Sequence, residues 1–114
     1  MLVENVAEIA NDSDSGEKLV NYAVGEYAAV AYDDHWYIGK VIHATDQEGD
    51  TEFLCMRRSR GLWQWPSPAP DTVWRTRSQI LCKISSPVPT GKSKRMFKIT
   101  ADDKARVEAR FAAQ

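Results

Sequence analysis

The stretch AYDDHWYIGKV, residues 31–41, decides the fold because it places three aromatic rings around a tight turn. The overlapping segment EYAAVAY alternates in polarity, and WYIGKVIHA is rich in aromatic and β-branched residues, so both are typical of strands. Two adjacent carboxylates, Asp33 and Asp34, followed by His35 form the short connection. The pattern predicts a β-hairpin whose rings either fill the core of a small β-fold or form a surface that binds a ligand.

The segments that follow continue the strand pattern as far as residue 84. The turn TDQEGD, residues 45–50, offers Gly49 for a positive φ, and TEFLCMRR is the third predicted strand. LWQW is a short fourth strand that ends at a proline-rich segment, because proline cannot donate a hydrogen bond within a sheet. TVWRT and QILCKI supply the last strand, with a 3₁₀ turn near Ser78. Five short strands without a long helix favour an all-β, SH3-like barrel.

Composition changes divide the chain into four parts. We predict an acidic, largely flexible leader over 1–22, the barrel over 23–86, a proline-bounded basic arm over 87–99 and a helix over 100–114.

The C-terminal segment TADDKARVEARFAAQ has the features of a short helix. Thr100 is a natural N-cap, and Asp102 and Asp103 suit the positive end of the helix dipole. Val107 and Phe111 are spaced four residues apart and share one face, which we expect to dock on the barrel.

Length and composition indicate one globular domain without a membrane span. The chain has 114 residues, of which 43% are hydrophobic and 27% charged. No apolar run is long enough to cross a membrane, no secretory signal is present, and Cys55 and Cys82 do not make a disulfide framework. We expect an intracellular, nuclear protein.

The net charge of -1 conceals a strong asymmetry. Residues 1–50 hold eleven acidic and two basic residues, whereas residues 51–114 hold five acidic and thirteen basic residues. This pattern predicts two faces with different partners, halves that neutralise each other, or charges that interleave on the folded surface.

Residues 25–98 carry several motifs of a known kind of domain. In order they are VGEYAAVAYDDHWYIGKV (which starts one residue earlier), FLCMRR, WQWP, DTVW, QILCKI and PVPTGKSKRMFKI. Together they resemble a C-terminal domain of proteins derived from DNA transposons. The first hairpin also resembles the Tudor branch of the SH3-like superfamily, in which one aromatic residue ends the first strand and a second begins the next. Tyr32 and the sequence Tyr37-Ile38-Gly39-Lys40-Val41 hold those positions.

The Tudor resemblance implies a non-enzymatic domain that binds a protein tail in an aromatic pocket. The tail would be histone-like and would carry methylated lysine or arginine. The resemblance places Tyr32 and Tyr37 outward and Trp36 in the core, because successive side chains of a strand face opposite ways. The chain departs from the Tudor pattern at CMRRSRG. The remaining predicted pocket residues are therefore the rim carboxylates Asp33 and Asp34, the wall residue Met56, and the rings of Trp63, Trp65 or Trp74.

Two other hypotheses stay open. Basic residues interleaved with tryptophans are suited to nucleic acid, and the candidates for this contact are Arg57, Arg58, Arg60, Lys92, Lys94 and Arg95. The third hypothesis is a structural or self-association domain that uses the terminal helix. We predict no catalytic residues, cofactor or metal, since His35 and His43 are isolated and no Cys-x-x-Cys pair occurs.

Overall fold

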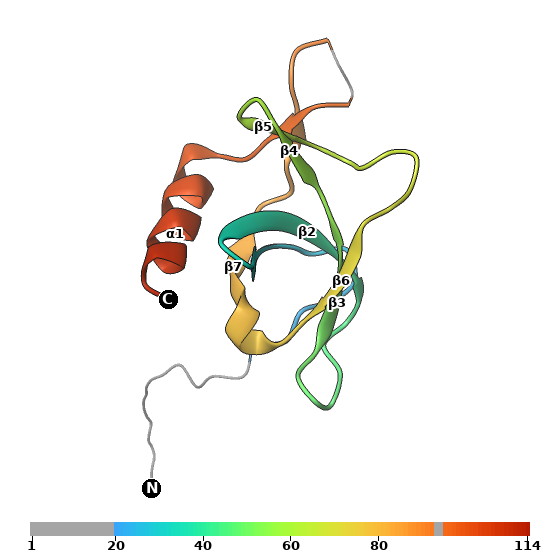
Figure 1. Ribbon diagram of the computed structural model, residues 1–114, viewed down its shortest axis with the longest axis vertical. Coiled ribbons are helices and arrows are strands. Elements are labelled where there is room, and N and C mark those ends of the chain that lie inside the picture. Colours follow the sequence, from blue (N-terminus) through green and yellow to red (C-terminus); the bar gives the residue numbers. More distant parts are fainter. Residues whose placement is uncertain (1–19, 93–94) are drawn as a thin grey trace, which may run out of the picture.

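The computed structural model describes residues 20–92 and 95–114, which form two antiparallel sheets and a C-terminal helix (Figure 1). The larger sheet has the strand order β6-β3-β2-β1-β7 and the smaller one β4-β5-β9-β8. The strands of the larger sheet are β1 (Tyr27–Tyr32), β2 (His35–His43), β3 (Thr51–Cys55), β6 (Thr72–Arg75) and β7 (Ile80–Ile84). Those of the smaller sheet are β4 (Arg57–Ser59), β5 (Leu62–Gln64), β8 (Val88–Pro89) and β9 (Phe97–Lys98). The remaining elements are the 3₁₀ helix η1 (Arg77–Gln79) and the helix α1 (Ala101–Ala112).

The prediction of a β-protein with a short C-terminal helix is confirmed. Strands β6 and β7 are the two edges of the larger sheet and are joined by η1, as expected for a 3₁₀ turn near Ser78. In the described part of the chain these two edges are not hydrogen-bonded to each other, so a closed barrel is not observed.

The first hairpin has the predicted form. Tyr32 pairs with His35 in the register between β1 and β2, which leaves Asp33 and Asp34 as a two-residue turn. Asp33 has a φ of 55°, a left-handed conformation that aspartate tolerates better than most residues. Trp36 is 6% exposed, which confirms its expected place in the core, and Ile38 on the same face is fully buried.

The predicted strand over residues 51–58 is instead two strands that belong to different sheets. β3 pairs with β2 and β6, whereas β4 pairs with β5. Met56 lies at the change of sheet, where its N–H donates to the Ile38 carbonyl at 2.8 Å and its side chain is buried. The turn between β4 and β5 has positive φ at both central residues, Arg60 and Gly61, which is typical of a type I′ hairpin.

Buried side chains form one cluster on each face of the larger sheet, as alternation along the strands requires. The first cluster packs between this sheet, the smaller sheet and α1, and contains Ala29, Trp36, Ile38, Met56, Trp63, Leu81, Ile84 and Val107. The second lies on the opposite face and contains Tyr22, Ala28, Val30, Val41, Phe53, Cys55 and Ile80.

The helix α1 begins as predicted and docks beside β7 (Figure 1). The Thr100 hydroxyl accepts a hydrogen bond from the Asp103 N–H at 3.0 Å. Val107 is fully buried and Phe111 packs against the same cluster, which confirms the predicted docking face. No helix among the described residues has the length and apolarity that crossing a membrane requires.

The segment predicted as an arm, 87–99, contains the short strands β8 and β9, which pair with each other while β9 also pairs with β5. Two-residue strands in a proline- and lysine-containing segment leave no periodicity to detect.

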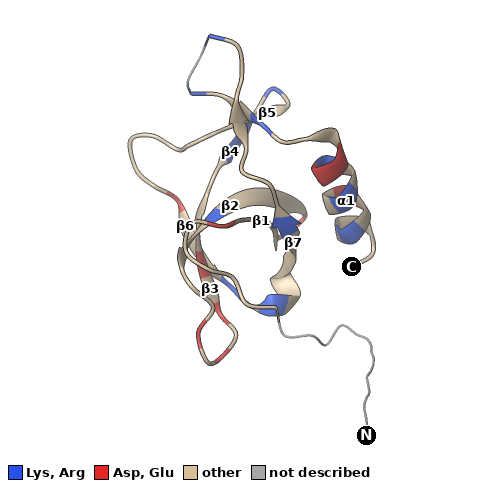
Figure 2. Ribbon diagram, turned by 180° about the vertical axis from the view of Figure 1, so that it is seen from behind, with Lys and Arg blue, Asp and Glu red and all other residues tan. Residues whose placement is uncertain are grey.

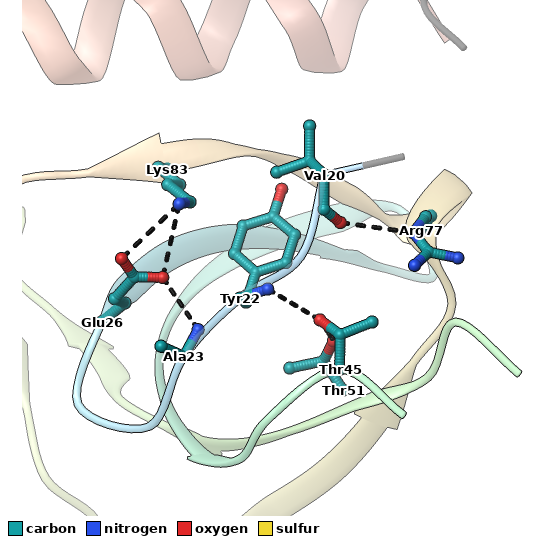
Figure 3. A network of polar contacts seen from close by, with 8 residues as sticks. All are labelled: Val20, Tyr22, Ala23, Glu26, Thr45, Thr51, Arg77 and Lys83. Atoms are coloured by element: carbon teal, nitrogen blue, oxygen red, sulfur yellow. Dashed lines mark hydrogen bonds and ion pairs between the residues drawn. The ribbon is translucent and has the colours of Figure 1, made fainter. Parts of the chain in front are cut away.

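Residues 20–26 also form part of the structured body (Figure 3). The Tyr22 N–H donates to the Thr45 hydroxyl at 2.8 Å, and the Tyr22 side chain is buried. The Arg77 guanidinium donates to the Val20 carbonyl at 3.2 Å. The end of the segment assigned to the leader therefore contributes a core side chain.

Candidate aromatic pocket

Two tyrosines of the first hairpin stand beside a hollow of about 240 Å³. The residues that line the hollow come from β1, β2, β3 and the start of β6: Val30, Tyr32, Tyr37, Cys55, Asp71, Thr72 and Val73. The rings of Tyr32 and Tyr37 have centroids 6.4 Å apart and planes at 82°. They share a face because Tyr32 pairs with His35, and Tyr37 follows His35 by two residues.

Pairing between β3 and β6 brings an acidic residue to the same hollow. The Cys55 N–H donates to the Asp71 carbonyl at 2.7 Å, and Leu54 pairs with Thr72. Asp71 is exposed, whereas Val30 and Cys55 are buried. The hollow is therefore apolar at its base, has the two tyrosine rings at its rim, and carries a negative charge from Asp71.

The Cys55 thiol is a poor nucleophile despite lining the hollow. Burial is the main cause that raises its pKa to about 12, and the nearby Asp71 charge adds to this effect. Because the thiolate is the reactive form, this pKa keeps Cys55 protonated at neutral pH.

A cation of the protein already contacts the Tyr32 ring. The Arg75 guanidinium lies 4.9 Å from the ring centroid, and it donates to the Ala31 carbonyl at 3.3 Å. Arg75 is not among the residues that line the hollow. Its charge opposes the entry of a second cation, and Asp71 supplies the opposite charge.

The other predicted pocket residues do not line this hollow. Met56 and Trp63 are 2% and 4% exposed and belong to the first core cluster. Trp65 packs against Tyr27 at 6.5 Å between centroids, and the half-exposed Trp74 stacks on His43 at 5.7 Å.

The predicted rim carboxylates, Asp33 and Asp34, lie exposed in the turn of the first hairpin and also do not line the hollow. Sequence reasoning missed the residues from β3 and β6 that complete it, because long-range strand pairing brings them there.

The residues predicted to contact nucleic acid differ in whether the rest of the protein already holds their side chains. Arg58 lies 4.2 Å from the Trp36 ring and 4.6 Å from the Trp63 ring, and donates to the Trp36 carbonyl at 2.8 Å. Arg58 therefore has a structural role. Arg57, Arg60, Lys92 and Arg95 are exposed on the two hairpins of the smaller sheet, whereas Lys94 lies outside the described residues.

Comparison with known proteins adds no family assignment. No protein-family model, curated protein or solved structure matches the chain.

Proposed function

We propose that this chain is a Tudor-like, SH3-like-barrel reader domain, without enzymatic activity, that binds a methylated lysine on a protein tail. The observation that carries this proposal is the pair of perpendicular tyrosine rings beside a small hollow that Asp71 also lines. Ring faces attract a methylammonium by about 0.5–1 kcal/mol each, and more where water is excluded. The hollow is smaller than the ~300–1,000 Å³ pockets that hold drug-sized ligands.

The ring geometry favours lysine over arginine. A guanidinium is planar and can stack on ring faces, and the one guanidinium of Arg58 lies close to both Trp36 and Trp63. The compact ammonium head group instead suits a corner between two perpendicular rings. The Asp71 carboxylate favours monomethyl or dimethyl over trimethyl lysine, because only an ammonium that keeps an N–H can donate a hydrogen bond to it.

The strand arrangement is consistent with the proposed fold. The order β1 to β3 as a meander, followed by β6, a 3₁₀ turn and β7 beside β1, is compatible with an SH3-like sheet into which the β4–β5 hairpin is inserted. A domain that binds methylated histone-like tails would act on chromatin, so the proposal includes a nuclear location.

The test is an NMR titration of the isotopically labelled chain with a short peptide that carries one dimethyllysine. We expect shift changes centred on Tyr32, Tyr37 and Asp71, weaker binding of the unmodified peptide, and weaker binding of the dimethylarginine peptide. Tyr37→Ala should weaken binding roughly 2- to 30-fold, corresponding to the loss of about 0.5–2 kcal/mol of ring attraction. Tyr37→Phe retains the ring and should bind nearly as well.

A second pair of variants tests the carboxylate. Asp71→Asn should weaken dimethyllysine binding more than trimethyllysine binding, whereas Asp34→Asn, which removes an exposed charge away from the hollow, should change neither. Equal affinity for modified and unmodified peptides, or shift changes confined to the smaller sheet, would reject the proposal.

A further inference from the structure

The two hairpins of the smaller sheet carry positive charge and contain no acidic residue of their own. Its two hairpins span residues 57–64 and 88–98, and their sequences RRSRGLWQ and VPTGKSKRMFK contain no Asp or Glu. Figure 2 shows Lys and Arg residues at this end of the molecule, while the loop between β2 and β3 is acidic. The charge asymmetry along the sequence therefore persists in space.

A cleft of about 460 Å³ lies where the two hairpins meet. Its lining residues are Arg57, Gln64, Trp65, Ser67, Arg95 and Phe97. Pairing of Arg57 with Gln64 and of Trp63 with Phe97 brings these segments together. The cleft is distinct from the tyrosine hollow, since the two share no lining residue.

The charged groups of the cleft favour an anionic ligand. Arg57 and Arg95 both line it and no carboxylate does. Within residues 20–92 and 95–114, no hydrogen bond or ion pair holds the exposed Arg57 guanidinium, in contrast to the neighbouring Arg58. A guanidinium in this state can bind phosphate oxygens in bidentate fashion without first breaking an internal contact.

The aromatic rings of the cleft further restrict which class of anionic ligand it can bind. Trp65 and Phe97 are half-buried, and the contact of Trp65 with Tyr27 helps to fix its position. Rings beside arginines provide stacking for bases together with neutralisation of phosphates. Both rings also pack against the first core cluster, and a phosphopeptide would use the arginines but not the exposed part of these rings. Duplex nucleic acid keeps its base faces stacked internally, so only an unpaired strand can use these rings.

We propose that this cleft binds single-stranded nucleic acid, with bases against Trp65 and Phe97 and phosphates on Arg57 and Arg95. The site is independent of the proposed lysine pocket.

The test is fluorescence anisotropy of a labelled single-stranded oligonucleotide with the intact chain over a salt series, beside the same sequence as a duplex. We expect the single strand to bind more tightly than the duplex. Arg57→Ala and Arg95→Ala should each weaken binding and reduce the slope of log K against log salt by about 0.7, the value for one phosphate contact on a single strand. Trp65→Ala should weaken binding about tenfold at every salt concentration, because stacking is not an ionic contact.

Lys104→Ala is the matched control, since it removes one exposed positive charge from α1 and leaves the smaller sheet unchanged. Circular dichroism establishes that each variant is folded. The proposal is overturned if the oligonucleotide does not bind, or if the duplex binds as tightly as the single strand. It is also overturned if Lys104→Ala weakens binding as much as Arg57→Ala does, or if a phosphopeptide binds more tightly and displaces the oligonucleotide.

Discussion

At the scale of single residues, Gly39 shows why the segment YIGKV needs a small side chain at its centre. A Cβ atom at Gly39 would lie 2.9 Å from the Cβ and Cδ1 atoms of Phe53, which is fully buried. The glycine therefore allows β2 to approach the Phe53 ring on β3. Gly39 also pairs with Cys55, which lines the tyrosine hollow.

We predict that Gly39→Ala destabilises the protein by about 1–3 kcal/mol, the usual cost of overpacking a core. This exceeds the ~0.5–1 kcal/mol that alanine gains over glycine within a strand. Urea denaturation should show a lower midpoint with an unchanged slope. The double variant with Phe53→Leu should lose less stability than the sum of the two single changes, since the smaller side chain relieves the overlap. Additive losses would show that the overlap with Phe53 is not the cause.

At the scale of elements, local sequence patterns predicted the features that depend on the register of a single hairpin. Alternation across one turn is enough to put Tyr32 and Tyr37 on one face. Asp71 reaches the same hollow through the pairing of β3 with β6, two segments separated by the inserted β4–β5 hairpin. No local pattern reveals such a pairing, and for the same reason the tryptophan of that hairpin, Trp63, could not be recognised as a core residue of the other face.

The attachment of α1 depends on a buried carboxylate. The Asp103 side chain accepts hydrogen bonds from the Ser85 N–H at 3.0 Å and the Arg106 guanidinium at 2.6 Å. Burial by itself raises the pKa of Asp103, but the donors outweigh it and hold the pKa below its ordinary value. The carboxylate therefore stabilises the folded state above its unfolded pKa of about 3.9, and this contribution is lost as the pH falls through the lower folded-state pKa.

We predict that Asp103→Asn lowers the free energy of unfolding by about 1.5–3 kcal/mol at neutral pH, the range for hydrogen bonds to a charged group. The difference from the unchanged protein should shrink as the pH falls below about 3.9, where the unfolded chain is also protonated. Denaturant unfolding over a pH series measures both effects. Asp102→Asn is the control, because this exposed neighbour accepts none of these hydrogen bonds. A loss that is the same at every pH would show that the charge is not the cause.

At the scale of the whole molecule, the two candidate sites occupy different sheets with different charge. The tyrosine hollow opens beside Asp71 on the larger sheet, whereas the basic cleft lies on the smaller sheet. The first core cluster joins the sheets and contains Trp36 and Trp63, with Arg58 against both rings. The rings of the segment AYDDHWYIGKV are therefore divided by face, with Trp36 in the structural core and the two tyrosines beside the candidate pocket.

In this arrangement α1 uses its apolar face within the molecule. Its apolar residue Val107 is fully buried against its own sheets, and Phe111 packs on the same cluster. Among the described residues, the large apolar side chains that are 44–65% exposed are spread over different segments: Val20, Val24, Tyr32, Trp74 and Val88. Single exposed apolar residues are common on monomeric proteins, and only a large contiguous patch indicates an interface.

We therefore predict a monomer in sedimentation velocity at about 150 mM salt, where the Debye length of ~8 Å screens attraction between the basic sheet and the acidic loop of another molecule. The sedimentation coefficient should stay constant over a tenfold range of protein concentration. Val107→Asp should lower stability, because it places a charge in the core, and it should not act by separating a dimer. A dimer that persists at this salt concentration would restore the self-association hypothesis and would require an interface other than the buried face of α1.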